Sequence, residues 1–119
     1  MNELQMGPIE SRFADMIWRN APVTAAALAR LAASELGWKK TTCYTVLKRL
    51  CDKGIFINEG GSVTPLITRK EYYAAQSRRF VDDSFAGSLP AFIAAFTSGR
   101  SLSDEEADAL RELLDGRRE

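Results

Sequence analysis

The segment from Trp38 to Gly54, WKKTTCYTVLKRLCDKG, constrains the chain most strongly because it has the pattern of one amphipathic helix. At about 100° per residue, four apolar side chains fall at i, i+3, i+4 and i+7 on one face. A hydroxyl of Thr41 or Thr42 is expected to cap the first turn, and Gly54 is expected to end the helix in the left-handed C′ position. The apolar face consists of Cys43, Val46, Leu47 and Leu50.

The opposite face of this segment is basic and rich in hydroxyl groups, which suits either of two roles. A helix of this kind can enter the major groove of DNA, or it can be an ordinary solvated surface helix. Local charge favours the first role. Residues 39–79 hold nine Lys/Arg and three acids, a net charge of +6, although the whole chain is neutral. Affinity for phosphates depends on this local charge. Residues 1–38 carry a net charge of −1, and residues 80–119 carry −5, so this acidic end would be repelled from a polyanion.

Two helices are expected before this segment, over Ile9–Arg19 and Ala25–Leu36. Pro22 breaks the first, Thr24 is a good N-cap for the second, and Gly37 closes it. Phe13, Met16 and Ile17 are expected on the apolar side of the first helix, with Ile9 as a further candidate. A second and third helix joined by a turn of three or four residues form a helix-turn-helix.

After Gly54 the sequence has the pattern of a β-hairpin. Ile55–Ile57 is β-prone, Gly60 and Gly61 form a turn signal, and Ser62–Ile67 is a second strand candidate. A hairpin directly after a helix-turn-helix predicts a winged helix-turn-helix. The expected fold class is therefore mainly α with a small β-hairpin, with residues 1–70 as the DNA-binding domain.

Three further helices are expected from Arg69 onwards, and we interpret residues 71–119 as a dimerisation region. Thr68 with Glu71 and Ser103 with Glu106 form capping boxes at two of the helix starts. About fifty residues are too few for an independent core, so the apolar stripes must be buried elsewhere, most simply against a second copy. A two-fold dimer would place two reading helices on successive turns of a palindrome. The helices span Arg69–Phe85, Leu89 to Ser98-Gly99, and Asp104–Leu114. The interface candidates, some of which are expected to pack within the chain, are Phe80, Phe85, Leu89, Phe92, Ile93, Phe96, Leu110 and Leu113.

The residue types present exclude several kinds of site. The chain has no histidine and no CxxC motif, so neither a metal site nor a cofactor is expected. No nucleophile–base pair is evident either, so we expect no enzyme. Cys43 and Cys51 stand about 12 Å apart along one helix, beyond the reach of a disulfide. Cys43 is expected in the core, while a redox role for Cys51 stays open.

No apolar run approaches the ~20 residues of a membrane span. The first ten residues, MNELQMGPIE, lack the basic and apolar regions of a signal peptide. We therefore expect a cytoplasmic protein without membrane insertion.

Taken in order, six segments of the chain resemble the penicillinase repressor family, of the BlaI/MecI type. Each segment is a weak match alone, but their order and spacing from Glu10 to Leu114 are specific. The segments are IW at Ile17-Trp18, APVTAAALA, GWKKTTCYTVLKRLCDKG, PLITRKEYY, GSLPAFIAAF and LSDEEADALRELL. The resemblance implies a homodimeric winged-helix repressor that binds an operator dyad on double-stranded DNA, for example at antibiotic-resistance genes.

The resemblance also implies a route of induction. Some family members are inactivated through a membrane sensor protease, and the bond that is cut aligns with Ala95–Phe96. This chain departs from the family pattern at Ala95, where the family has Asn. Its wing is shorter over Glu59–Ser62, and its terminal DGRRE lacks the cysteine tail of the copper-responsive relatives.

The predicted helix of the Trp38–Gly54 segment, entered through the short turn Trp38–Lys40, supplies the candidate DNA contacts. Phosphate contact is assigned to Lys39, Lys40, Arg49 and Lys53, with Thr41 or Thr42 positioning the backbone at the helix start. Base-edge contact is assigned to Thr42, Thr45 and Lys48, and Tyr44 is expected on sugar or phosphate. Arg49 has a competing structural role, a salt bridge to Asp52 or Glu35. Trp38 either anchors the turn in the core or touches the DNA backbone.

A rival function from another class is a protein-interaction adaptor, because winged helices can bind proteins and the C-terminal end is acidic. Salt-dependent DNA binding distinguishes the two.

Overall fold

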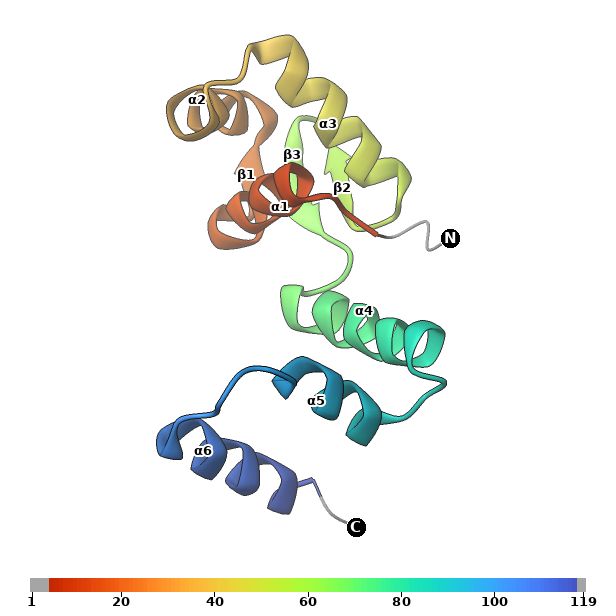
Figure 1. The fold of residues 1–119 in the computed structure, drawn as a ribbon. Coiled ribbons are helices and arrows are strands. Elements are labelled where there is room, and N and C mark those ends of the chain that lie inside the picture. The colour runs from red at the N-terminus through yellow and green to blue at the C-terminus, as the bar shows by residue number, and fades with distance from the viewer. Residues whose placement is uncertain (1–4, 118–119) are drawn as a thin grey trace. The chain divides into compact units, whose positions relative to one another are not determined.

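The computed structural model describes residues 5–117, and the chain divides into two compact units, Met1–Gln76 and Ser77–Glu119 (Figure 1). The fold is mostly helical with one small antiparallel sheet, which confirms the predicted winged helix-turn-helix class. The elements in chain order are α1 (Pro8–Asn20), β1 (Val23–Thr24), α2 (Ala25–Leu36), α3 (Lys40–Asp52), β2 (Phe56–Glu59), β3 (Ser62–Pro65), α4 (Arg69–Ser84), α5 (Leu89–Thr97) and α6 (Asp104–Asp115).

The helix-turn-helix is delimited by local signals. Thr24 caps α2, since its hydroxyl accepts a hydrogen bond of 3.0 Å from the Ala27 N–H. Gly37 ends α2 with φ at +68°, a left-handed conformation that glycine adopts without strain. Only Trp38 and Lys39 then separate this glycine from α3, so the second and third helices are joined by the short turn that the sequence predicts.

The sheet has the strand order β1-β3-β2. Gly60 and Gly61, both with positive φ, connect β2 to β3 by the two-residue turn expected of a tight hairpin. The short strand β1 pairs with β3 through Val23 and Val63. The hairpin bounds differ from the prediction: β2 begins one residue later and extends to Glu59, whereas β3 ends at Pro65 rather than at Ile67.

The core lies in the first unit. Every buried hydrophobic residue of the described chain falls between Phe13 and Tyr72. Ile9 is 51% exposed, so its predicted place in the core is wrong: it lies at the first turn of α1, away from the buried face. Trp38 packs on Phe13 with ring centroids 5.0 Å apart, which favours the core-anchoring alternative for this tryptophan.

In the described part of the second unit, α5 and α6 have no buried residue. None of the helices in residues 5–117 combines the length and apolar character needed to cross a membrane.

Candidate nucleic-acid interface

The two faces of α3 differ as the periodicity predicts. The apolar face is buried, with Cys43 and Leu50 at 0% exposure. The opposite face is exposed and consists of Thr41, Thr42, Tyr44, Thr45, Lys48, Arg49 and Asp52. Packing of α3 on the core thus leaves a continuous polar surface along the helix, which we call the outer face of α3.

The start of α3 differs from the prediction. Lys39 occupies the N-cap position with an extended backbone and no side-chain cap, so the predicted cap by Thr41 or Thr42 is wrong. Because Trp38 is anchored on Phe13, the chain enters the helix immediately and both threonines lie inside its first turn. Without a side-chain cap, backbone N–H groups of this turn can bind an anion.

Two contacts organise the outer face of α3. The ammonium of Lys40 lies 5.8 Å from the ring centroid of Tyr44, a cation–π distance. The hydroxyl of Thr45 donates a hydrogen bond of 2.9 Å to the backbone oxygen of Thr41. Its oxygen can still accept a hydrogen bond from outside the chain.

The cations near the C-terminal end of α3 are unequal. Lys48 forms an exposed ion pair of 3.1 Å with Asp52, which costs little to release. The predicted salt bridge of Arg49 to Asp52 or Glu35 is not formed, because Lys48 pairs with Asp52 and Arg19 pairs with Glu35. Arg49 is therefore exposed and available to a partner.

Lys53 is engaged within the chain. Its ammonium donates to the backbone oxygen of Gln5 at 2.9 Å and pairs with the Glu10 carboxylate at 3.2 Å. The Lys53 and Glu10 side chains are only 19% and 18% exposed. This arrangement argues against the phosphate contact predicted for Lys53. Sequence reasoning missed the partner because Glu10 lies on α1, 43 residues earlier.

The wing offers no basic side chain at its tip. The turn consists of Glu59, Gly60, Gly61 and Ser62, all exposed. An acidic residue at this position does not attract phosphate, so the wing tip adds no electrostatic attraction for DNA.

The cysteines are free, with Cys43 buried and Cys51 half-buried. Burial raises the pKa of both thiols, and the neighbouring Asp52 raises that of Cys51 further. A raised pKa keeps the thiol protonated and disfavours its reaction as a nucleophile. Within residues 5–117, no three or more His, Cys, Asp or Glu side chains come together to hold a metal ion.

Residues 6–116 match the penicillinase repressor family. The chain belongs to this family. The penicillinase repressor of Bacillus licheniformis is 25% identical over 115 residues, which cover 93% of this chain and 90% of that protein. Members of the family are DNA-binding transcriptional repressors, and the resemblance found in the sequence is confirmed.

A second candidate surface of this penicillinase repressor family member lies on the described helices of Ser77–Glu119. Here Phe80, Leu89, Phe96 and Leu113 are 48–54% exposed, and Ile93 is 36% exposed. The remaining predicted interface residues, Phe85, Phe92 and Leu110, are half-buried. The rings of Phe80, Phe85 and Phe92 lie 5.5–6.0 Å apart, so part of the predicted interface packs within the chain.

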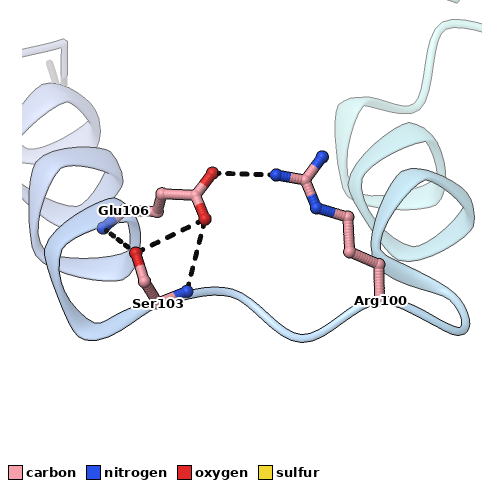
Figure 2. Close-up of polar contacts among 3 residues, drawn as sticks. All are labelled: Arg100, Ser103 and Glu106. Atoms are coloured by element: carbon pink, nitrogen blue, oxygen red, sulfur yellow. Dashed lines mark hydrogen bonds and ion pairs between the residues drawn. The ribbon is translucent and has the colours of Figure 1, made fainter.

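An apolar groove of about 350 Å³ lies between α5 and α6. The connection beside it is held by polar contacts (Figure 2). The Ser103 hydroxyl accepts from the Glu106 N–H at 3.1 Å, and the Glu106 carboxylate pairs with Arg100 at 3.1 Å. This arrangement confirms the predicted capping box of α6. The groove is lined by Phe92, Ile93, Phe96, Thr97, Leu102, Glu106, Ala109 and Leu110.

Proposed function

We propose that this chain represses transcription as a homodimer that binds a palindromic operator, with α3 in the major groove. The observation that carries the proposal is the outer face of α3, whose side chains the core does not use. Any polar residues would suffice on the solvent-facing side of an ordinary surface helix. The outer face of α3 instead combines cations with hydroxyl groups, in a locally basic part of the chain.

The proposed phosphate contacts are Lys39, Lys40 and Arg49. The first two flank the uncapped start of α3, where backbone N–H groups add to their attraction for phosphate. Lys40 and Tyr44 lie together, so Tyr44 is proposed to contact the same sugar–phosphate strand.

The proposed base contacts are Thr42, Thr45 and Lys48. Since the Thr45 hydrogen is donated to Thr41, its oxygen is an acceptor and its methyl group is apolar. These groups suit an adenine or cytosine amino group or a thymine methyl group. Lys48, once released from Asp52, suits the acceptors of guanine.

The second unit is proposed to form the dimer. Its exposed phenylalanine and leucine side chains would be covered by the same surface of another copy. Two linked reading helices bind a dyad more tightly than either alone, because the second half-site is met at high effective concentration.

Induction is proposed to follow loss of this dimer. The Ala95–Phe96 bond, which the family resemblance marks for cleavage by a sensor protease pathway, lies inside α5. Proteases act preferentially on locally opened chain, so α5 would have to unwind before cleavage. The relative from Bacillus licheniformis is a penicillinase repressor, and we propose antibiotic-resistance or related genes as targets.

The test is fluorescence anisotropy with DNA from upstream of the chain's own gene, at two salt concentrations, with a shuffled sequence as control. Repression predicts tight binding to the upstream DNA, weaker binding to the shuffled DNA, and a steep loss of affinity with salt. No salt-dependent binding to either DNA would contradict the proposal and favour the protein-interaction adaptor.

A further inference from the structure

The ion pair between Lys53 and Glu10 differs from the others in its burial. Six other ion pairs in the described part of the chain have side chains 35–77% exposed. Lys53 and Glu10 are 19% and 18% exposed. A pair shielded from water is screened less by salt, and removing one partner leaves the other charge poorly solvated. This pair, which we call the Lys53–Glu10 bridge, is therefore expected to constrain the fold more than the surface pairs do.

The bridge acts on the C-terminal end of α3. Lys53 is the C-cap residue of this helix. Its backbone N–H donates to the Arg49 oxygen, and the backbone N–H of Gly54 donates to the Cys51 oxygen. Its side chain reaches the first turn of α1 at Glu10 and the backbone oxygen of Gln5. The end of α3 is thus fixed to two points near the start of the chain.

The same N-terminal segment contacts a further helix. Tyr72 of α4 is 3% exposed. Burial raises the pKa of its phenol, and a hydrogen bond from the backbone of Met6 acts in the opposite direction. Gln5 and Met6 therefore link the C-terminal end of α3 to the first turn of α4 within the first unit.

We propose that the Lys53–Glu10 bridge positions α3 for DNA reading and that Lys53 is not itself a phosphate contact. The inference rests on the proposed function of α3. Side chains that read bases must be held to within about 0.5 Å, and such precision requires support from neighbouring groups. Fixing the C-cap residue of α3 sets the axial rotation and height of the outer face of this helix.

Replacement of Glu10→Gln separates the two roles of Lys53 by the sign of its effect. If Lys53 contacts phosphate, Glu10→Gln frees a cation and removes an anion, so DNA binding becomes tighter. If the bridge positions α3, the same change weakens operator binding by about fivefold, the size typical of coupling between residues in contact. The salt slope should then be unchanged.

Three further variants complete the anisotropy experiment. Lys53→Gln should weaken binding as much as Glu10→Gln, and the double variant should be no weaker than either single variant, because both break one interaction. Lys53→Arg keeps both donated contacts and should restore near-normal binding. Glu35→Gln is the matched control, since it also removes an acid from an ion pair, here the exposed one with Arg19, and should not weaken binding.

Amide hydrogen exchange of the free protein supplies a readout without DNA. Exchange at Leu50–Lys53 should be faster in Glu10→Gln and Lys53→Gln than in the wild type, and unchanged in Glu35→Gln. Tighter DNA binding by Glu10→Gln, or unchanged exchange in both bridge variants, would overturn the inference. If the wild type binds no DNA, the proposed function fails and the positioning role fails with it, whereas exchange still reports whether the bridge holds α3.

Discussion

The two units of the chain bury their apolar side chains to very different extents. Met1–Gln76 contains every buried hydrophobic residue of the described chain, whereas α5 and α6 contain none. The first unit completes its own core and can present a polar helix face in a fixed geometry. The second unit leaves phenylalanine and leucine side chains about half exposed, as expected for a surface that another copy covers.

The two units also differ in net charge. Met1–Gln76 holds ten Lys/Arg and seven Asp/Glu, whereas Ser77–Glu119 holds six and nine. The net charges are +3 and −3, so only the first unit attracts a polyanion. This difference supports the proposals that the first unit reads DNA and that the second unit pairs with another copy.

The largest expected effect is on folding of the first unit. Phe13→Ala removes a fully buried ring that packs on Trp38, and should lower the free energy of unfolding by about 3–5 kcal/mol. Phe96→Ala, at a 54% exposed site, should lower it far less at concentrations where the chain is monomeric. Urea unfolding of both variants measures this difference, and equal losses would break the comparison.

The next effect is on self-association. Phe96→Asp places a charge in the exposed apolar surface and should weaken dimerisation by about 100-fold, as for a central interface residue. Sedimentation equilibrium measures the change. Glu105→Gln, on the exposed polar side of α6, is the control. A Phe96→Asp protein that associates like the wild type would remove Phe96 from the interface.

A smaller effect is expected from the cations at the start of α3. Lys39→Ala or Lys40→Ala should weaken binding to all DNA sequences and lower the magnitude of the salt slope by about one unit. Lys70→Ala, an exposed lysine on α4, should leave the slope unchanged. Anisotropy over a salt series decides the matter, and an unchanged slope removes that lysine from the phosphate contacts.

Thr45 should affect only one base pair. Thr45→Val keeps the methyl group and loses the hydroxyl, so preference at one operator position should fall by about tenfold, while other positions are unchanged. Competition binding with a set of single-base-pair operator variants measures this. Equal weakening on every DNA would place Thr45 outside the readout.

The smallest effect concerns the capping box that starts α4. The backbone N–H and hydroxyl of Thr68 lower the pKa of Glu71. A lowered folded-state pKa means that the contribution to stability is full above the unfolded pKa of about 4.3 and is lost as the pH falls through the folded pKa. Glu71→Gln should therefore lower the thermal midpoint at pH 7 and have less effect at pH 3. Melting curves at both pH values test this, and an equal effect at both would contradict it.

Features set by near neighbours could be predicted from the sequence. The Gly60-Gly61 turn requires positive φ at both positions, and the capping box of Ser103 and Glu106 spans four residues. The exposed outer face of α3 followed from the helical period. The roles assigned to its side chains on DNA stay predictions.

Features set by distant residues could not be predicted. The sequence around Lys53 does not indicate that its partner is Glu10, 43 residues earlier. Likewise, β1 pairs with β3 across forty residues, Val23 with Val63. The start of α3 also differs from the prediction: Lys39 is its N-cap without a side-chain hydrogen bond, and Trp38 before it packs on the distant Phe13.

The most direct test of the account is a titration of the intact chain against the upstream dyad and against a single half-site, with stoichiometry measured on both. A homodimer that reads the dyad predicts two chains per dyad, half-site binding weaker by at least about 100-fold, and loss of this advantage in Phe96→Asp. One chain per dyad with equal affinity for the dyad and the half-site would contradict it.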